Sequence, residues 1–149
     1  MILRMPTEKE LGPLSELCLR SKGFWGYDEA FLKACRAELT LSLNELEHDH
    51  LIVADQDGIF LGVAHLVVKG DQATLEKLFI DPSAIGRGVG KRLFDWATNT
   101  ARTLKAASLS INSDPGAEAF YQKMGAKTVQ HVTSGSIPGR TLPQMLFQL

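Results

Sequence analysis

The sequence predicts an α+β fold in which helices flank a mixed, mostly antiparallel sheet. Apolar, β-branched segments of strand length alternate with segments of helical periodicity along the chain. Two strand-like segments, 51–54 and 59–68, are joined by Asp-Gln-Asp-Gly, which is a hairpin signal. Two others, 74–80 and 107–111, are separated by a long helical segment, and such a crossover lets the two strands lie parallel.

The first forty residues predict one strand and two helices. Residues 1–5 have the pattern of a short strand, which Pro6 stops. Thr7 is predicted to cap a helix that runs to about residue 20, because Glu10 stands in the capping-box position. Asp28 is predicted to cap a second helix that runs to about residue 39. The apolar stripe of this helix consists of Phe31, Cys35 and Leu39.

The second half of the chain predicts two more helices and a terminal hairpin. The strand 74–80 ends at Asp81-Pro82, and a long helix is predicted from about Gly88 to Lys105. Its expected buried face comprises Val89, Leu93, Trp96, Thr100 and Leu104. Asp114-Pro115 predicts a further helix start, and Gly125 ends that helix. Its expected inner face comprises Ala117, Phe120, Tyr121 and Met124. Two last strands are expected on either side of the turn 135–139.

Size and composition limit the possible classes of protein. A chain of 149 residues fits one domain, so we expect a single domain over 1–149. The net charge of −1 argues against a non-specific nucleic-acid partner, which would need a basic excess. No apolar run approaches the roughly 18 residues of a membrane helix, so we expect no membrane partner. With only Cys18 and Cys35, and no signal-peptide pattern in the first residues, we expect a reduced, cytoplasmic protein. A homodimer remains possible.

A glycine-rich segment between the strand 74–80 and the long helix is the strongest local motif. Gly86, Gly88 and Gly90 let the backbone approach a ligand, and the helix N-terminus adds the positive end of its dipole. These features predict a pyrophosphate site, with charge supplied by Arg87, Lys91 and Arg92. A P-loop is excluded because Ile85 and Arg92 replace its glycine and its hydroxyl residue. A Rossmann turn would need a third glycine where Lys91 stands. An ordinary glycine-rich connection is the remaining alternative.

The segment resembles the acyl-CoA signature of the GNAT superfamily of acyl-CoA-dependent N-acyltransferases. Gly88 and Gly90 match that signature, whereas Ile85 stands where the family has Gln or Arg. A second family element follows the strand 107–111, where Asp114 replaces the usual Asn. Its other positions agree with the family: Ala117, Phe120, Tyr121 and Gly125. The stretches 21–27 and 136–143 resemble a bacterial GNAT subgroup of unassigned substrate.

The resemblance implies acetyl-CoA as cofactor and two central parallel strands that splay apart around it. The pantetheine arm would then pair with strand backbone at Leu78, Phe79 and Ile80, near the oxyanion donor. The residues implied at the pyrophosphate are Gly86, Arg87, Gly88, Val89, Gly90 and Lys91. Further cofactor contacts are implied for Asp114, Ala117 and Tyr121. The acceptor would be a primary amine of a small molecule or peptide, which attacks the thioester directly.

Two residues are candidates for the proton transfers that this reaction needs. An amine with a pKa of about 10.4 arrives protonated and must lose a proton before it attacks. The resemblance implies Glu76 as the base and Tyr121 as the acid that protonates the departing thiolate. The alternatives are that Glu76 pairs with a strand neighbour or faces solvent, and that Tyr121 packs in the core. Lys77 must point to the opposite face of the strand from Glu76.

Several weaker candidates surround the expected acceptor site. Trp25 and Tyr27 form either a substrate wall or simple packing, and Arg140 either binds an acceptor carboxylate or lies at the surface. His65 is a second possible base, although a hydrogen-bonded structural histidine is the more common case. The run of charged residues 47–50 lacks the spacing of a metal-binding helix pair, so a solvated turn and no metal are expected there.

Two function classes therefore remain. One is an acetyl-CoA-dependent N-acetyltransferase, which the presence of both Glu76 and Tyr121 favours. The other is a non-catalytic acyl-CoA-binding sensor or regulatory module, to which Ile85 gives some weight.

Overall fold

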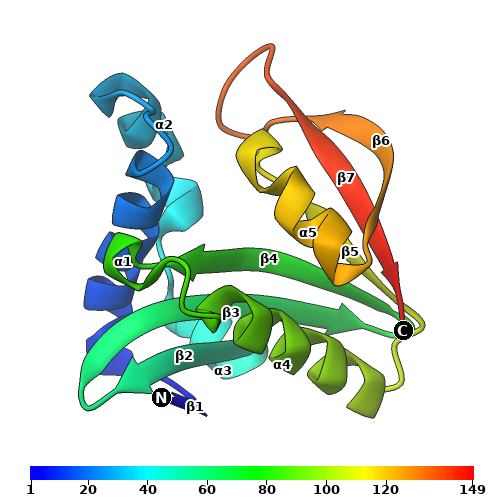
Figure 1. The fold of residues 1–149 in the computed structure, drawn as a ribbon, viewed down its shortest axis with the longest axis horizontal. Helices are drawn as coiled ribbons and strands as arrows, with labels where there is room; N and C mark the ends of the chain where they lie inside the picture. Colours follow the sequence, from blue (N-terminus) through cyan, green and yellow to red (C-terminus); the bar gives the residue numbers. More distant parts are fainter.

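A computed structural model describes residues 1–149 as one seven-stranded sheet with helices on both faces (Figure 1). The strands are β1 (Ile2–Arg4), β2 (His50–Gln56), β3 (Ile59–Lys69), β4 (Gln72–Ile80), β5 (Ser108–Asn112), β6 (Lys127–Thr133) and β7 (Thr141–Gln148). The α-helices are α1 (Leu11–Gly23), α2 (Glu29–Leu39), α3 (Leu43–His48), α4 (Val89–Thr103) and α5 (Glu118–Met124). Single 3₁₀ turns form η1 (Glu8–Glu10), η2 (Pro82–Ala84) and η3 (Pro115–Ala117).

The strand order is β1-β2-β3-β4-β5-β7-β6, and only β4 and β5 are parallel. This arrangement confirms the predicted mixed, mostly antiparallel sheet. The β2–β3 hairpin also forms as predicted, because Asp57 and Gly58 both adopt the positive φ angles of a tight hairpin turn.

The predicted helix starts are present because their caps are local. Thr7 and Glu10 form a capping box at η1, which leads into α1. The Asp28 carboxylate accepts a hydrogen bond from the Phe31 N–H at the start of α2. Asp114 does the same for Gly116 at η3, and Gly125 ends α5 with a left-handed φ of 109°. No helix of the chain is long and apolar enough to cross a membrane.

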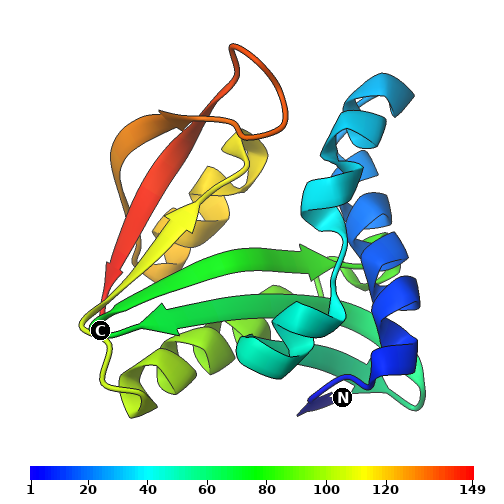
Figure 2. The same ribbon diagram turned by 180° about the vertical axis from the view of Figure 1, so that it is seen from behind.

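Two hydrophobic clusters sandwich the sheet. On one face, α4 and α5 pack against the larger cluster, which includes Leu93, Phe94 and Tyr121 (Figure 1). On the other face, α1 and α2 bury residues such as Leu14 and Cys35 against β2 and β3; Figure 2 shows the sheet from this side. β4 is the central strand of the sheet. Near its C-terminal end, α1 and α2 lie on one side, and the strands β5, β7 and β6 lie with α5 on the other (Figure 1).

β4 and β5 separate soon after they begin. Their parallel pairing covers only Gln72–Thr74 with Ser108–Ser110, although β4 continues to Ile80. Beyond Thr74, the edge of β4 that faces β5 has no strand partner. The predicted splay of the two central parallel strands is therefore confirmed, and it opens the sheet toward the glycine-rich segment.

The structure corrects two details of the helices. The buried face of α4 continues from Leu93 through Phe94, Ala97 and Ala101, whereas Leu104 is exposed and Trp96 and Thr100 are only half-buried. Ala97 and Ala101 are fully buried in the core cluster, whereas Trp96 packs against it only in part. The segment 43–48 forms the short helix α3, capped by Ser42 and Glu45, so Glu47 and His48 lie on a helix instead of in a turn.

Candidate active site

A cavity of about 930 Å³ occupies the space where β4 and β5 diverge. Most of the predicted site residues line it, from five different segments of the chain. These residues are Trp25, Glu76, Leu78, Phe79, Ile80, Gly86, Gly88, Val89, Gly90, Lys91, Asp114, Ala117 and Tyr121. Four predicted residues do not line it: Tyr27, His65, Arg87 and Arg92. A cavity of this size is typical of a site for a cofactor or small substrate.

The glycine-rich segment forms an open cradle at the N-terminus of α4. Gly86 and Gly88 have φ angles of 82° and 78°, which L-residues rarely adopt, and Gly88 is the N-cap of the helix. A Cβ atom built on Gly88 would meet no atom within 4 Å, so the space in front of this backbone is open. A Cβ on Gly90 would lie 3.2 Å from the Phe120 ring, so a larger residue here would force this ring to shift by a few tenths of an ångström. The geometry suits a phosphate held by backbone N–H groups.

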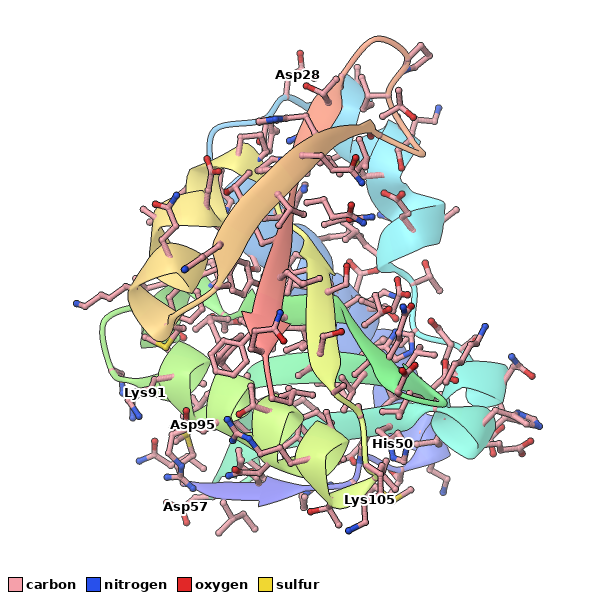
Figure 3. All side chains as sticks on the ribbon, turned by 90° about the vertical axis from the view of Figure 1, so that its right-hand side faces the viewer. Asp28, His50, Asp57, Lys91, Asp95 and Lys105 are labelled. Atoms are coloured by element: carbon pink, nitrogen blue, oxygen red, sulfur yellow. The ribbon has the colours of Figure 1, made fainter.

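The charges predicted beside the cradle are only partly available. Lys91 lines the cavity, and its Nζ lies 2.7 Å from the Asp95 carboxylate one turn along α4. Figure 3 shows both side chains projecting from α4 at the surface. The structure does not bring Arg87 into the cavity, because its guanidinium turns away to the Gln56 side chain. The cradle therefore depends on its backbone more than on side-chain charge.

A β-bulge sets the orientation of Glu76. His65 of β3 pairs with Lys77, whereas Leu66 pairs with Leu75, so Glu76 is the extra residue of β4. Both Glu76 and Lys77 line the cavity, but the Glu76 side chain is exposed, whereas Lys77 is only 8% exposed. The Lys77 ammonium donates a hydrogen bond to Glu45 of α3, on the face of the sheet that also carries α1. The expectation that Glu76 and Lys77 point to different sides is confirmed. Glu76 forms no hydrogen bond or salt bridge with a strand neighbour, which is one of the two alternatives. Its exposed side chain agrees with the other alternative, a residue that faces solvent, so its role as a base stays a prediction.

Tyr121 lies on the inner face of α5, in the wall of the cavity. Its ring is 6% exposed and packs against Phe94 and Phe120. No protein group forms a hydrogen bond with its hydroxyl. Every fully buried side-chain oxygen in the structure has a partner, so this unpartnered hydroxyl is not fully buried and is accessible from the cavity that Tyr121 lines. Burial, and then the negative charge of Asp114, raise the pKa of Tyr121, so the phenol is a proton donor at neutral pH.

Asp114 and Arg140 line one end of the cavity together with Lys22, which the sequence analysis missed, and Tyr27 contacts them from outside it. The Asp114 carboxylate accepts hydrogen bonds from Lys22, Tyr27 and Arg140. Trp25 lies beside them with its ring against Gly116; it lines the cavity, and about half of its surface is exposed. Tyr27 stands behind this wall, stacked on Phe31.

His65 lies outside the cavity. Its Nε2 is 2.8 Å from the Asp49 carboxylate, and its Nδ1 is 3.3 Å from Glu45, in a buried network that Lys77 completes. The structure thus gives His65 the hydrogen-bonded structural environment that was the more common alternative. Glu45, Asp49 and His65 also place their ligand atoms within 4.8 Å of one another, but the Lys77 ammonium already supplies a cation to this group.

Neither cysteine contributes a nucleophile to the cavity. Cys18 and Cys35 are both buried free thiols in the cluster on the α1–α2 face. Burial raises the pKa of Cys18 to about 12 and raises that of Cys35 as well, so both remain protonated.

Comparison with known proteins identifies the family. The family model described as "Acetyltransferase (GNAT) domain" matches residues 7–135. The chain belongs to the GNAT acetyltransferase family. This family uses acetyl-CoA, and the mixed sheet with its one parallel pair, β4 and β5, is the GNAT fold.

Solved GNAT structures share this fold along nearly the whole chain. The PaiA N-acetyltransferase from Thermoplasma acidophilum, in complex with coenzyme A, has a TM-score of 0.84 at 20% identity. The match covers 99% of this chain and 98% of that one. A GCN5-related N-acetyltransferase from Rhodopseudomonas palustris has a TM-score of 0.80 at 23% identity, with 99% and 95% covered. An aminoglycoside 6′-N-acetyltransferase complexed with coenzyme A has a TM-score of 0.72 at 14% identity, with 99% and 97% covered.

Proposed function

We propose that this protein acetylates a primary amine of a small molecule or peptide, with acetyl-CoA as the donor. The observation that carries the proposal is that one cavity unites the glycine cradle, the unpaired edge of β4, Glu76 and Tyr121. Coenzyme A in the solved relatives supports this cofactor for the same fold. The protein would act as a single domain over residues 1–149.

The cradle suits the cofactor on its own geometry. The left-handed Gly86 and Gly88 and the open space before Gly88 fit a pyrophosphate that approaches the first turn of α4. We assign the pyrophosphate to the segment 86–91. The unpaired edge of β4 at Leu78, Phe79 and Ile80 suits the amide groups of the pantetheine arm, by strand addition. We assign Asp114 and Ala117 to the wall that flanks this arm.

Acetyl-CoA supplies a thioester carbonyl, and the residues of the chain move the protons. Glu76 accepts a proton from the acceptor ammonium, directly or through water, which frees the amine lone pair for attack. A backbone N–H of β4 near Leu78 or Phe79 stabilises the charge that develops on the carbonyl oxygen. The C–N bond forms as the C–S bond breaks, and the Tyr121 hydroxyl gives its proton to the departing sulfur. The second proton on the attacking nitrogen leaves as the amide forms and returns to the Tyr121 oxygen, directly or through water. The proton on Glu76 passes to solvent, so the ammonium and the thioester give the amide, the CoA thiol and one proton.

Direct attack is favoured over an acetylated enzyme. The two thiols of the chain are buried outside the cavity and are held protonated, so neither offers a nucleophile to the thioester. Both substrates would therefore occupy the cavity together.

A thiol-release assay with acetyl-CoA and a panel of amines tests the function. An acetyltransferase releases CoA only when a suitable amine is present, and in equal amount with the acetylated product. The Glu76→Gln protein is the matched control, because it keeps the shape of the side chain but removes the base. A non-catalytic sensor is the alternative, and Ile85 at the cradle is the residue that favours it. That alternative predicts tight acetyl-CoA binding by calorimetry and no amine-dependent release with any member of the panel.

A further inference from the structure

Four polar residues form a hydrogen-bonded cluster at the end of the cavity that faces α1 and α2. This Asp114 cluster comprises Lys22, Tyr27, Asp114 and Arg140. The Lys22 Nζ lies 2.8 Å from Asp114 Oδ2, and the Tyr27 hydroxyl lies 3.0 Å from the same oxygen. The Arg140 Nη2 lies 2.9 Å from the Tyr27 hydroxyl and 3.2 Å from Asp114 Oδ2. The cluster joins segments that lie on opposite sides of the cavity in the fold (Figure 1).

The charges in this cluster do not cancel. Two cations share one carboxylate, so these side chains carry a net charge of about +1. The exposed fractions are 12% for Lys22, 13% for Asp114 and 17% for Arg140. Glu38 also lines the cavity, and its carboxylate accepts a hydrogen bond from Ser136. It forms no salt bridge with either cation, so its negative charge opposes theirs only from beyond 4.0 Å. A positive charge withdrawn from water favours a bound anion.

Hydrogen-bond donors also remain unused. Arg140 spends only Nη2 within the protein, so its Nε and Nη1 groups are free, and Lys22 spends one of its three N–H bonds. No fully buried side-chain nitrogen lacks a partner. The unpartnered Nε and Nη1 atoms of Arg140 are therefore not fully buried, and Arg140 and Lys22 both lie in the cavity wall.

Aromatic rings hold the two cations in place. Tyr27 stacks on Phe31 with ring centroids 4.0 Å apart. The Arg140 guanidinium lies 4.9 Å from the Phe31 centroid, and the Lys22 ammonium lies 5.6 Å from the Tyr27 centroid. Burial alone would raise the pKa of Asp114, but the hydrogen bonds from Lys22 and Gly116 outweigh it, and the net pKa is lowered. The carboxylate thus stays ionised at neutral pH and fixes both cations in position.

We propose that the Asp114 cluster binds a carboxylate of the acceptor, so that the substrate is an amine that also carries a carboxylate. Free amino acids and peptides with a free C-terminus belong to this class. A net charge near +1 matches a carboxylate better than a phosphate dianion, and the free edge of Arg140 suits a planar carboxylate. The exposed rings of Phe24 and Trp25 line the adjoining surface, where they suit an apolar part of the acceptor. This inference rests on the proposed function, since it names the acceptor class of the same cavity.

The test compares each amine acid with its own carboxamide, over a panel of amino acids and short peptides. Calorimetry on the protein saturated with CoA measures binding of each partner without turnover. We expect the acid to bind about 10- to 100-fold more tightly than the carboxamide, the range of a charge-assisted hydrogen bond to a partly buried group. Arg140→Gln and, separately, Lys22→Gln should each reduce this ratio about 10-fold or more. Arg36→Gln removes the same charge from a salt bridge with Glu16 at the surface, outside the cavity, and should leave the ratio unchanged.

Three results overturn the proposal. One is the absence of acid preference in the wild-type protein across the panel. A second is a preference that persists in both cluster variants, each shown to be folded by circular dichroism. The third is a loss that appears in acetyl-CoA affinity instead of acceptor affinity, which would assign these cations to the cofactor.

Thiol release on the same pairs separates this proposal from the proposed function. Acid preference in binding, without acetylation of any member, upholds the carboxylate site and contradicts the transferase. Acetylation without acid preference upholds the transferase and contradicts the carboxylate site.

Discussion

Replacing Tyr121 with phenylalanine separates the chemistry of its hydroxyl from the packing of its ring. The ring contacts Phe94 and Phe120 at centroid distances of 6.0 Å and 5.1 Å, and phenylalanine keeps both contacts. The hydroxyl has no partner within the protein, so no intramolecular hydrogen bond is lost. The free energy of unfolding should therefore change by less than about 1 kcal/mol, the typical value of one hydrogen bond.

The rate should respond far more than the stability. Loss of a general acid lowers turnover by about 10²-fold or more, which corresponds to about 2.7 kcal/mol of transition-state stabilisation. Because burial raises the pKa of Tyr121, the hydroxyl stays protonated, and the deficit should be constant between about pH 7 and pH 9.

The assay is thiol release with an acceptor for which chemistry is rate-limiting. Thermal unfolding and acetyl-CoA calorimetry serve as controls on fold and cofactor affinity. Wild-type turnover in a folded Tyr121→Phe protein would refute the assignment and return Tyr121 to a packing role.

Three further predictions concern the cradle, the base and acid stability. Gly88→Glu should abolish acetyl-CoA binding in calorimetry, because it places a negative charge at the phosphate site. Gly88→Asn should weaken binding less, since asparagine tolerates the left-handed φ of 78° and adds no charge. Full acetyl-CoA affinity in a folded Gly88→Glu protein would contradict the cradle. Glu76→Gln should reduce the rate most at neutral pH and less as the pH nears the pKa of the acceptor amine, and a pH-independent deficit would indicate a positioning role instead. Burial would raise the pKa of Glu45, but the Ser42 N–H and the Lys77 ammonium outweigh it, so the pKa is lowered in the folded protein. The ionised Glu45 therefore stabilises the folded state above its unfolded pKa, and this contribution is lost as the pH falls through the lower folded pKa. Urea unfolding between about pH 5 and pH 3 should therefore show a smaller loss of stability in Glu45→Gln than in the wild type, and equal losses would exclude this contribution.

Local signals in the sequence predicted most of the fold. Caps such as Thr7 and Asp28 act within one helical turn, and the Asp57-Gly58 turn acts between adjacent strands, so each is readable from neighbouring residues. The face of α4 was harder to predict, because the choice between Trp96 and Ala97 depends on how closely the sheet lies beneath the helix. That distance is a property of the packed molecule.

In the candidate site, too, the features set by neighbouring residues were predicted, and those set by long-range contacts were not. The cradle and the α5 motif are continuous in sequence, and apart from Arg87 and Arg92 the residues predicted there line the cavity. The Asp114 cluster joins residues that are 92 and 26 positions apart from Asp114, and a lysine near a helix end gives no signal of such a contact. The outward turn of Arg87 to Gln56 is likewise set by the distant β2–β3 hairpin.

The initial-rate pattern of acetyl transfer tests the central claim most directly. Initial rates would be measured over a matrix of acetyl-CoA and acceptor concentrations, with the amine identified by the panel. If both substrates occupy the cavity together and the amine attacks the thioester directly, double-reciprocal plots should give intersecting lines. Parallel lines, the pattern of an acetylated-enzyme intermediate, would contradict the account, as would the absence of amine-dependent turnover.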